Sequence, residues 1–84
     1  MNHYTSSDFW ELYGKLPAEI RDLADKNFEL LKANPYHSSL QLKRIEELWS
    51  VRVGRHYRAI GIDAPDGIQW IWIGSHADYD KFFR

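Results

Sequence analysis

The sequence predicts an α+β fold, with helices in its N-terminal half and strands in its C-terminal half. Apolar and polar residues alternate from Leu48 to Val53 and again after a short Gly-Arg-His break. This pattern predicts two antiparallel strands joined in a hairpin that ends near residue 62. Between residues 17 and 34, apolar residues recur at the i, i+3, i+4, i+7 spacing of one helix face. The 84 residues form a single domain, 1–84, and four tryptophans supply burial area for a small core.

The first helix is expected over residues 7–14. Ser7 and Asp8 are both candidates for its N-cap, because their side-chain oxygens can accept the free N–H groups of the first turn. If Asp8 is the cap, Glu11 stands where it completes a capping box. Gly14 then ends the helix.

The second helix is expected to begin at Pro17, whose missing N–H costs nothing in a first turn. It should end near Asn34, because Pro35 disfavours helical backbone in the residue before it. Charged residues occupy the positions outside the apolar stripe, so one face of the helix is buried and the other meets solvent. The stripe consists of Ile20, Leu23, Ala24, Asn27, Leu30 and Leu31.

A third strand and a short helix are predicted after the hairpin. Pro65 and Gly67 mark a turn, and the nearly all-apolar segment 68–74 predicts a strand that is central or covered on both faces. Ser75 is a candidate N-cap for a terminal helix over residues 76–84. Three segments have less regular patterns. Residues 2–5 form an optional first strand, residues 34–39 a turn-rich loop, and residues 40–47 an ambiguous lead into the hairpin.

The hairpin separates apolar from basic side chains. Alternation gives one face of the first hairpin strand the residues Trp49, Val51 and Val53. Ser50 and Arg52 lie on the other face, and Arg58 joins them if the strand register allows. A row of guanidinium groups is suited to bind an anion. The basic face of the hairpin is therefore the candidate functional surface.

Charge is distributed unevenly along the chain. The formal net charge is −1, but residues 35–62 carry +3 between two flanks that each carry −2. Such a basic island can bind phosphate, although it steers nucleic acid less than a strongly basic protein does. The absence of cysteine excludes disulfides and thiolate metal sites and fits a reducing compartment. Because no apolar run reaches membrane-spanning length and no signal peptide is evident, we expect a cytoplasmic protein without membrane contact.

Three segments resemble the RelE/ParE superfamily of toxins from type II toxin–antitoxin systems, in particular its small ParE-like branch. They are LKANPYHSSL, WSVRVGRHYRAI and WIGSHADYD, at residues 31–40, 49–60 and 72–80. Their order matches the family, and the resemblance covers nearly the whole chain. It implies a RelE/ParE-like fold, a small antiparallel β-sheet with two N-terminal helices packed on one face and a short C-terminal helix. The opposite, concave face of the sheet is expected to carry function.

The resemblance implies two different activities. RelE-like members cut messenger RNA in the ribosomal A site, without metal, by promoting attack of a ribose 2′-OH on the adjacent phosphate. ParE-like members block DNA gyrase by protein contact, and a family member that only binds an antitoxin is a third alternative. Our first hypothesis is the ribosome-dependent endoribonuclease. The expected partners are a cognate antitoxin and ribosome-bound mRNA, or DNA gyrase under the alternative, and no cofactor is expected.

Two arginines match positions that RelE-like nucleases use. Arg58 falls where those enzymes have a strand arginine that stabilises the phosphate, and Arg52 falls where the preceding strand often carries a basic residue. The resemblance implies that both clamp the scissile phosphate, where negative charge builds up during cleavage.

The terminal segment supplies the other implied catalytic residues. His76 follows the last strand where the family places an arginine or a histidine, and it would protonate the leaving 5′-oxygen. Asp80, four residues later, can hold the imidazolium or repel RNA phosphate. Tyr79 would stack on a base or assist proton transfer, a place that Phe82 or Phe83 fills equally well.

One departure from the family pattern affects the chemistry. Ser50 stands where catalytic members often have a lysine, so the general base is unassigned. His56, in the hairpin break, is interpreted as a solvated turn residue, with a phosphate contact as the alternative. No metal site is predicted. The remaining basic residues of the island are predicted to contact RNA phosphate, namely Lys43, Arg44 and Arg55.

Overall fold

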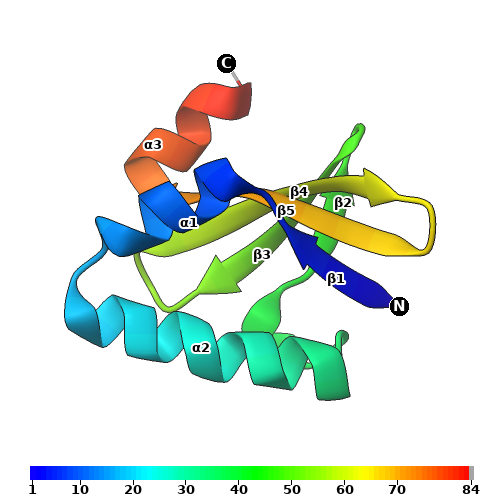
Figure 1. Ribbon diagram of the computed structural model, residues 1–84, viewed down its shortest axis with the longest axis horizontal. Coiled ribbons are helices and arrows are strands. Elements are labelled where there is room, and N and C mark those ends of the chain that lie inside the picture. Colours follow the sequence, from blue (N-terminus) through cyan, green and yellow to red (C-terminus); the bar gives the residue numbers. More distant parts are fainter. Residues whose placement is uncertain (84) are drawn as a thin grey trace.

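A five-stranded mixed sheet forms the centre of the molecule (Figure 1). The computed structural model describes residues 1–83. The strand order is β1-β5-β4-β3-β2, with β1 parallel to β5 and every other neighbouring pair antiparallel. The α+β class and the hairpin are confirmed, while the purely antiparallel sheet is corrected by β1. The strands are β1 (Asn2–Thr5), β2 (Lys43–Ile45), β3 (Leu48–Val53), β4 (Tyr57–Ala64) and β5 (Gly67–Ser75).

Both predicted N-terminal helices form. They are α1 (Ser7–Gly14) and α2 (Ala18–Ala33), and Figure 1 shows α1 across the front of the sheet and α2 running below it. The N-cap of α1 is Ser6, whose hydroxyl accepts the Phe9 N–H at 3.1 Å. The expected caps, Ser7 and Asp8, were therefore wrong, because the chain leaves β1 in extended backbone one residue earlier. No helix within residues 1–83 is long and apolar enough to cross a membrane.

The C-terminal segment forms α3 (His76–Asp80) and a short 3-10 helix, η2 (Lys81–Phe83). Ser75 caps α3 as predicted, since its hydroxyl accepts the Asp78 N–H at 3.2 Å. The last residue of the expected helix, Arg84, lies outside the described residues.

The main hydrophobic core lies between the sheet and the α1 and α2 helices. Alternating residues of the strands supply one side of it and the α2 stripe supplies the other. Its buried members are Leu16, Leu31, Leu40, Val51, Val53, Ala59, Ile68, Trp70 and Ile73. Because these residues fix which strand face points inward, they also fix which side chains lie on the opposite face.

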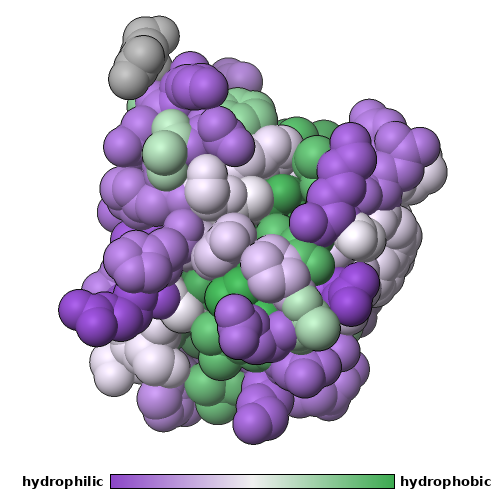
Figure 2. Space-filling view, turned by 90° about the vertical axis from the view of Figure 1, so that its left-hand side faces the viewer, coloured by the Kyte–Doolittle hydropathy of each residue, from purple (hydrophilic) through white to green (hydrophobic). Residues whose placement is uncertain are grey.

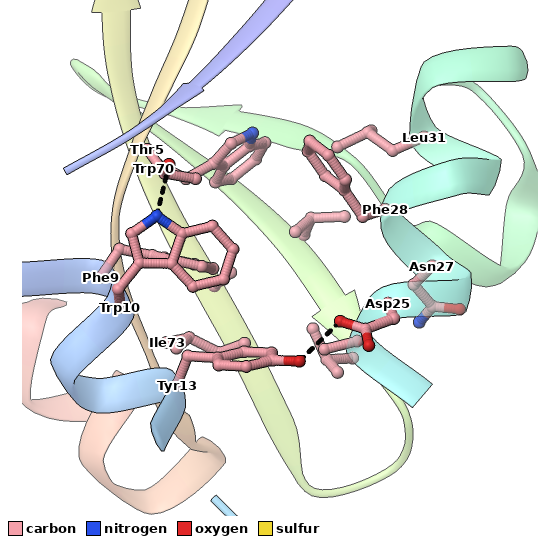
Figure 3. Close-up of a pocket in the computed structure, with 14 residues that line it drawn as sticks. Thr5, Phe9, Trp10, Tyr13, Asp25, Asn27, Phe28, Leu31, Trp70 and Ile73 are labelled. Carbon is pink, nitrogen blue, oxygen red and sulfur yellow. Dashed lines mark hydrogen bonds between the residues drawn. The ribbon is translucent and has the colours of Figure 1, made fainter. Parts of the chain in front are cut away.

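An apolar cavity of about 80 Å³ remains between α1, α2 and the sheet (Figure 3). Two hydrogen bonds lie at its edge, from Trp10 Nε1 to Thr5 Oγ1 and from the Tyr13 hydroxyl to Asp25 Oδ1, both at 2.8 Å. On the side of the molecule that includes this region, apolar side chains form a strip between polar flanks (Figure 2). The packing of α1 against α2 is therefore incomplete.

The ambiguous stretch before the hairpin contains a 3-10 helix, η1 (Ser38–Leu40), and the edge strand β2. Ile45 pairs with Leu48, so Glu46 and Glu47 form a two-residue hairpin loop. Glu46 has a φ of 57°, a left-handed conformation that favours glycine. This strain was not apparent from the sequence.

Replacing Glu46 by glycine is expected to stabilise the fold by about 0.5–1 kcal/mol, because glycine adopts a positive φ without steric cost. In a domain of this size that change raises the melting temperature by roughly 2–8 °C in thermal unfolding. Glu47→Gly is the matched control, since Glu47 has no positive φ and gains only flexibility. Equal stabilisation by the two variants would contradict the explanation.

The N-terminal strand is attached to the core through His3. Its Nδ1 accepts a hydrogen bond from Trp70 Nε1 at 3.1 Å, and its ring stacks on Trp70 at a centroid distance of 6.2 Å. Burial, followed by the positive charges of the N-terminus and Lys32, lowers the pKa of His3 below its ordinary value of 6.5. Gly67 on β5 lets β1 approach closely, because a Cβ at this position would overlap the Asn2 backbone.

Acidification is therefore expected to destabilise the protein through His3. The lowered pKa means that His3 binds a proton more tightly in the unfolded chain than in the folded one. The contribution of His3 to the free energy of unfolding is therefore complete above pH 6.5 and is lost as the pH falls toward the folded-state pKa. Protonation also converts Nδ1 from an acceptor into a donor facing Trp70 Nε1. Chemical unfolding at a series of pH values should show a smaller acid dependence in His3→Gln. An unchanged dependence would exclude His3 as the cause.

Candidate functional site

Two arginines lie opposite each other on the face of the sheet that points away from α1 and α2. Arg52 on β3 pairs directly with Arg58 on β4, and Gly74 on β5 completes the row. Their neighbours Val51 and Ala59 point into the core, so both arginines point to the other face. The register condition stated for the hairpin is thus met. Like charges placed directly opposite repel each other, which favours the binding of an anion between them.

Arg58 is held in place but keeps one unused donor. Its Nη2 donates to Gln41 Oε1 at 3.4 Å, and its guanidinium lies 5.6 Å from the centre of the Tyr79 ring. The Nη1 atom is buried without a hydrogen-bond partner among the described residues. A buried charged donor without a partner is costly, and an anionic ligand would satisfy it.

Arg52 is positioned by the chain itself. Its Nε donates to the Gly54 carbonyl at 2.9 Å, in the turn that connects β3 to β4. Gly54 has a φ of 67°, which allows this turn. Neither Arg52 nor Arg58 forms an ion pair with a carboxylate of residues 1–83. An ion pair of either arginine with Glu46 or Glu47, the alternative to binding an anion, is therefore not found among the described residues.

His76 lies at the start of α3. Its backbone N–H donates to the His56 carbonyl at 2.7 Å, which joins α3 to the β3–β4 turn. Its side chain is 47% exposed, and its Nδ1 lies 3.6 Å from Asp80 Oδ2. The ring is 5.7 Å from that of Tyr79. The structure thus brings His76 close to the aromatic residue that covers Arg58.

Tyr79 is 6% exposed and packs between Arg58 and Phe83, whose ring lies 5.0 Å away. In this position it is a wall of the site, and it cannot stack on a base without moving. Phe82 and Phe83 are 45% and 36% exposed, and Phe82 contacts Trp72 edge-on at 5.0 Å. The exposed aromatic surface beside the arginines therefore comes from these two residues.

The other basic residues are not gathered at one place. Lys43 is exposed and pairs with Ser50, which puts it on the arginine face. Arg55 is exposed in the β3–β4 turn. Arg44, however, pairs with Trp49 on the helix side of the sheet, so it lies apart from the arginine pair.

Arg44 is also engaged in a structural contact. It forms two hydrogen bonds to the Asp63 carboxylate, at 2.8 and 2.6 Å, and lies over the Trp49 ring. Hydrogen bonds from Arg44 and then from Trp49 lower the pKa of Asp63 below its usual value. We therefore leave Arg44 out of the candidate site.

Ser50 lies on the arginine face but is fully buried. Its exposure is 0%, and its hydroxyl has no hydrogen-bond partner among the described residues. A buried, uncharged hydroxyl does not take the place of a surface lysine.

The comparison with protein families decides the identity of the domain. The ParE-like toxin domain matches residues 18–81. This chain belongs to that family. A search of curated protein sequences finds no match.

Solved structures support the ParE-like fold over almost the entire chain. The RelE of a RelB–RelE antitoxin–toxin complex from Methanococcus jannaschii is 19% identical, with a TM-score of 0.74 over 96% of this chain and 99% of that chain. YafQ from Escherichia coli is 14% identical, with a TM-score of 0.70 over 93% and 96%. A YoeB/ParE toxin from Agrobacterium tumefaciens is 15% identical, with a TM-score of 0.68 over 90% and 99%. The predicted RelE/ParE superfamily is thereby confirmed.

Two features of this ParE-like site were missed in the sequence. Gln41, which holds Arg58, comes from the segment whose structure was ambiguous. His56 is exposed in the turn, as predicted, but the hydrogen bond from the His76 N–H to its carbonyl was not foreseen. Counting back from the β4–β5 turn places His56 opposite Ser75, because the register shift between Ile60 and Gly61 adds one residue to β5.

Proposed function

We propose that this ParE-like chain is a toxin that cuts ribosome-bound messenger RNA. The observation that carries the proposal is the direct pairing of Arg58 with Arg52 across β3 and β4 on the functional face. Two guanidinium groups without carboxylate partners are suited to a phosphodiester. The exposed phenylalanines beside them offer flat surfaces to unpaired bases.

The proposed reaction is transfer of the phosphate to the neighbouring ribose 2′-oxygen. Arg52 and Arg58 stabilise the negative charge that develops on the phosphate oxygens. His76, half-exposed and beside the Asp80 carboxylate, donates a proton to the leaving 5′-oxygen. Tyr79 holds Arg58 in place through its ring.

The experiment is primer extension on a defined message in a cell-free translation reaction, with wild type, Arg58→Ala and His76→Ala. New 5′ ends within A-site codons, lost in both variants, are expected. Cleavage that survives in both folded variants would refute the roles of Arg58 and His76, and an uncut message with wild type would refute the nuclease. If wild type leaves the message intact, a gyrase supercoiling assay tests the alternative activity.

Gyrase inhibition of the ParE type has one observation in its favour. The buried Ser50 replaces a lysine that catalytic relatives often have, and a protein-binding toxin needs no base. Inhibition of supercoiling by wild type and by Arg58→Ala alike, with uncut message, would support this function instead.

We further propose an antitoxin as the partner, encoded beside this gene. The similar structures include RelB–RelE antitoxin–toxin complexes. A ligand that binds only the folded state raises its apparent stability, by about 2.7 kcal/mol at a free concentration of 100 Kd. The neighbouring gene product should therefore raise the melting temperature of this chain. No shift would exclude that gene product as the antitoxin.

A further inference from the structure

Two histidines lie opposite each other at one end of the β4–β5 pair. Tyr57 pairs with Ser75 in the antiparallel ladder. Continuing this register by one residue places His56 opposite His76, and the His76 N–H donates to the His56 carbonyl at 2.7 Å. Both histidines are exposed, so the two residues lie next to each other at the surface.

The histidine pair forms the row next to the arginine pair. His56 precedes Arg58 by two residues, and His76 follows Gly74 by two. Since Arg52 lies opposite Arg58, the contact between His56 and His76 borders the arginine pair at the end of the sheet where α3 begins.

The charges around the two rings differ. His76 has the Asp80 carboxylate at 3.6 Å and the Tyr79 ring at 5.7 Å. His56 follows Arg55 in the turn and forms no ion pair with a carboxylate of the described residues. The described residues contain no group of three or more histidine or carboxylate side chains that could hold a metal ion.

We propose that His56 is the general base of the cleavage reaction, with His76 as the general acid. This inference rests on the nuclease function proposed above. It supplies the base that the buried Ser50 cannot provide. A pair of imidazoles is suited to the task because the attacking and leaving oxygens lie on opposite sides of the phosphorus.

The step is balanced in atoms and protons. His56 removes the proton of the 2′-OH while the 2′-oxygen forms a bond to phosphorus. The bond from phosphorus to the 5′-oxygen breaks, and that oxygen takes a proton from His76. The products are a 2′,3′-cyclic phosphate and a 5′-hydroxyl end, and exchange with water then restores both imidazoles.

The test is single-turnover cleavage of a defined message on ribosomes, between about pH 5.5 and 8.5, with wild type, His56→Gln and His76→Gln. Each variant should cut about 100- to 10,000-fold more slowly, with unchanged binding to the ribosome. Wild type should give a bell-shaped profile, from which His56→Gln removes the acid limb and His76→Gln the alkaline limb. His37→Gln is the matched control, because His37 lies in the loop before η1 and contacts Ser39.

A second measurement does not depend on cleavage. In an NMR titration with inorganic phosphate, the imidazole signals of His56 and His76 should shift together, while those of His37 should not. A response of His76 alone would overturn the pairing. Cleavage by His56→Gln at the wild-type rate would overturn the base role while leaving the nuclease intact. If wild type cuts no message, the nuclease and the base role fall together.

Discussion

The variant Arg58→Ala is expected to cut its message about 100- to 1,000-fold more slowly than wild type in single-turnover reactions, the usual loss when one preorganised donor to a developing oxyanion is removed. Arg58 lies directly opposite Arg52, and Tyr79 and Gln41 hold its guanidinium in place. Arg58→Lys should recover only part of the rate, because a lysine keeps the charge but cannot form the two-pronged contact.

Stability measurements separate this loss from unfolding. Removing Arg58 also removes a buried unsatisfied donor and its repulsion with Arg52, so the alanine variant should melt no lower than wild type. Arg44→Ala is the control among the basic residues, since Arg44 binds Asp63 on the other face. A wild-type cleavage rate in Arg58→Ala, or an equal loss in Arg44→Ala, would refute the assignment.

The elements with strong periodic patterns could be predicted from the sequence. The apolar stripe of α2 and the alternation in β3 and β4 each predict one buried face. In the structure these faces pack against one another in the hydrophobic core. Alternation also placed Arg52 and Arg58 on a common face, which the register confirms. The Ser75 cap was predictable because capping is a local interaction.

The remaining features depend on contacts between distant segments. The edge strands β1 and β2 are too short for periodicity to define them, and β1 runs parallel to β5 because of where α1 begins. Arg44 follows Lys43, so the two must point to opposite faces, but this was hidden until β2 was known to be a strand. The contact of His56 with His76 likewise depends on the β4–β5 register, which shifts by one residue between Ile60 and Gly61.

The largest expected loss of stability is that of Trp70→Ala, at about 3–5 kcal/mol. Trp70 is 2% exposed in the core and lines the cavity below α1 and α2, so its removal enlarges a void that is already present. It also leaves the His3 Nδ1 without its donor. Domains of this size are stable by only about 0.05–0.15 kcal/mol per residue, so the variant should be largely unfolded or close to it.

A second tryptophan provides the control for this prediction. Trp10 is 52% exposed and donates to Thr5 at the surface, so Trp10→Ala should cost about 1 kcal/mol, as expected for a partly exposed side chain with one hydrogen bond. Urea unfolding followed by circular dichroism gives both values. Similar losses in the two variants would mean that the core described between α2 and β5 does not carry the fold. A loss several-fold larger in Trp70→Ala than in Trp10→Ala would show that the core behind the arginine face carries the stability of the fold.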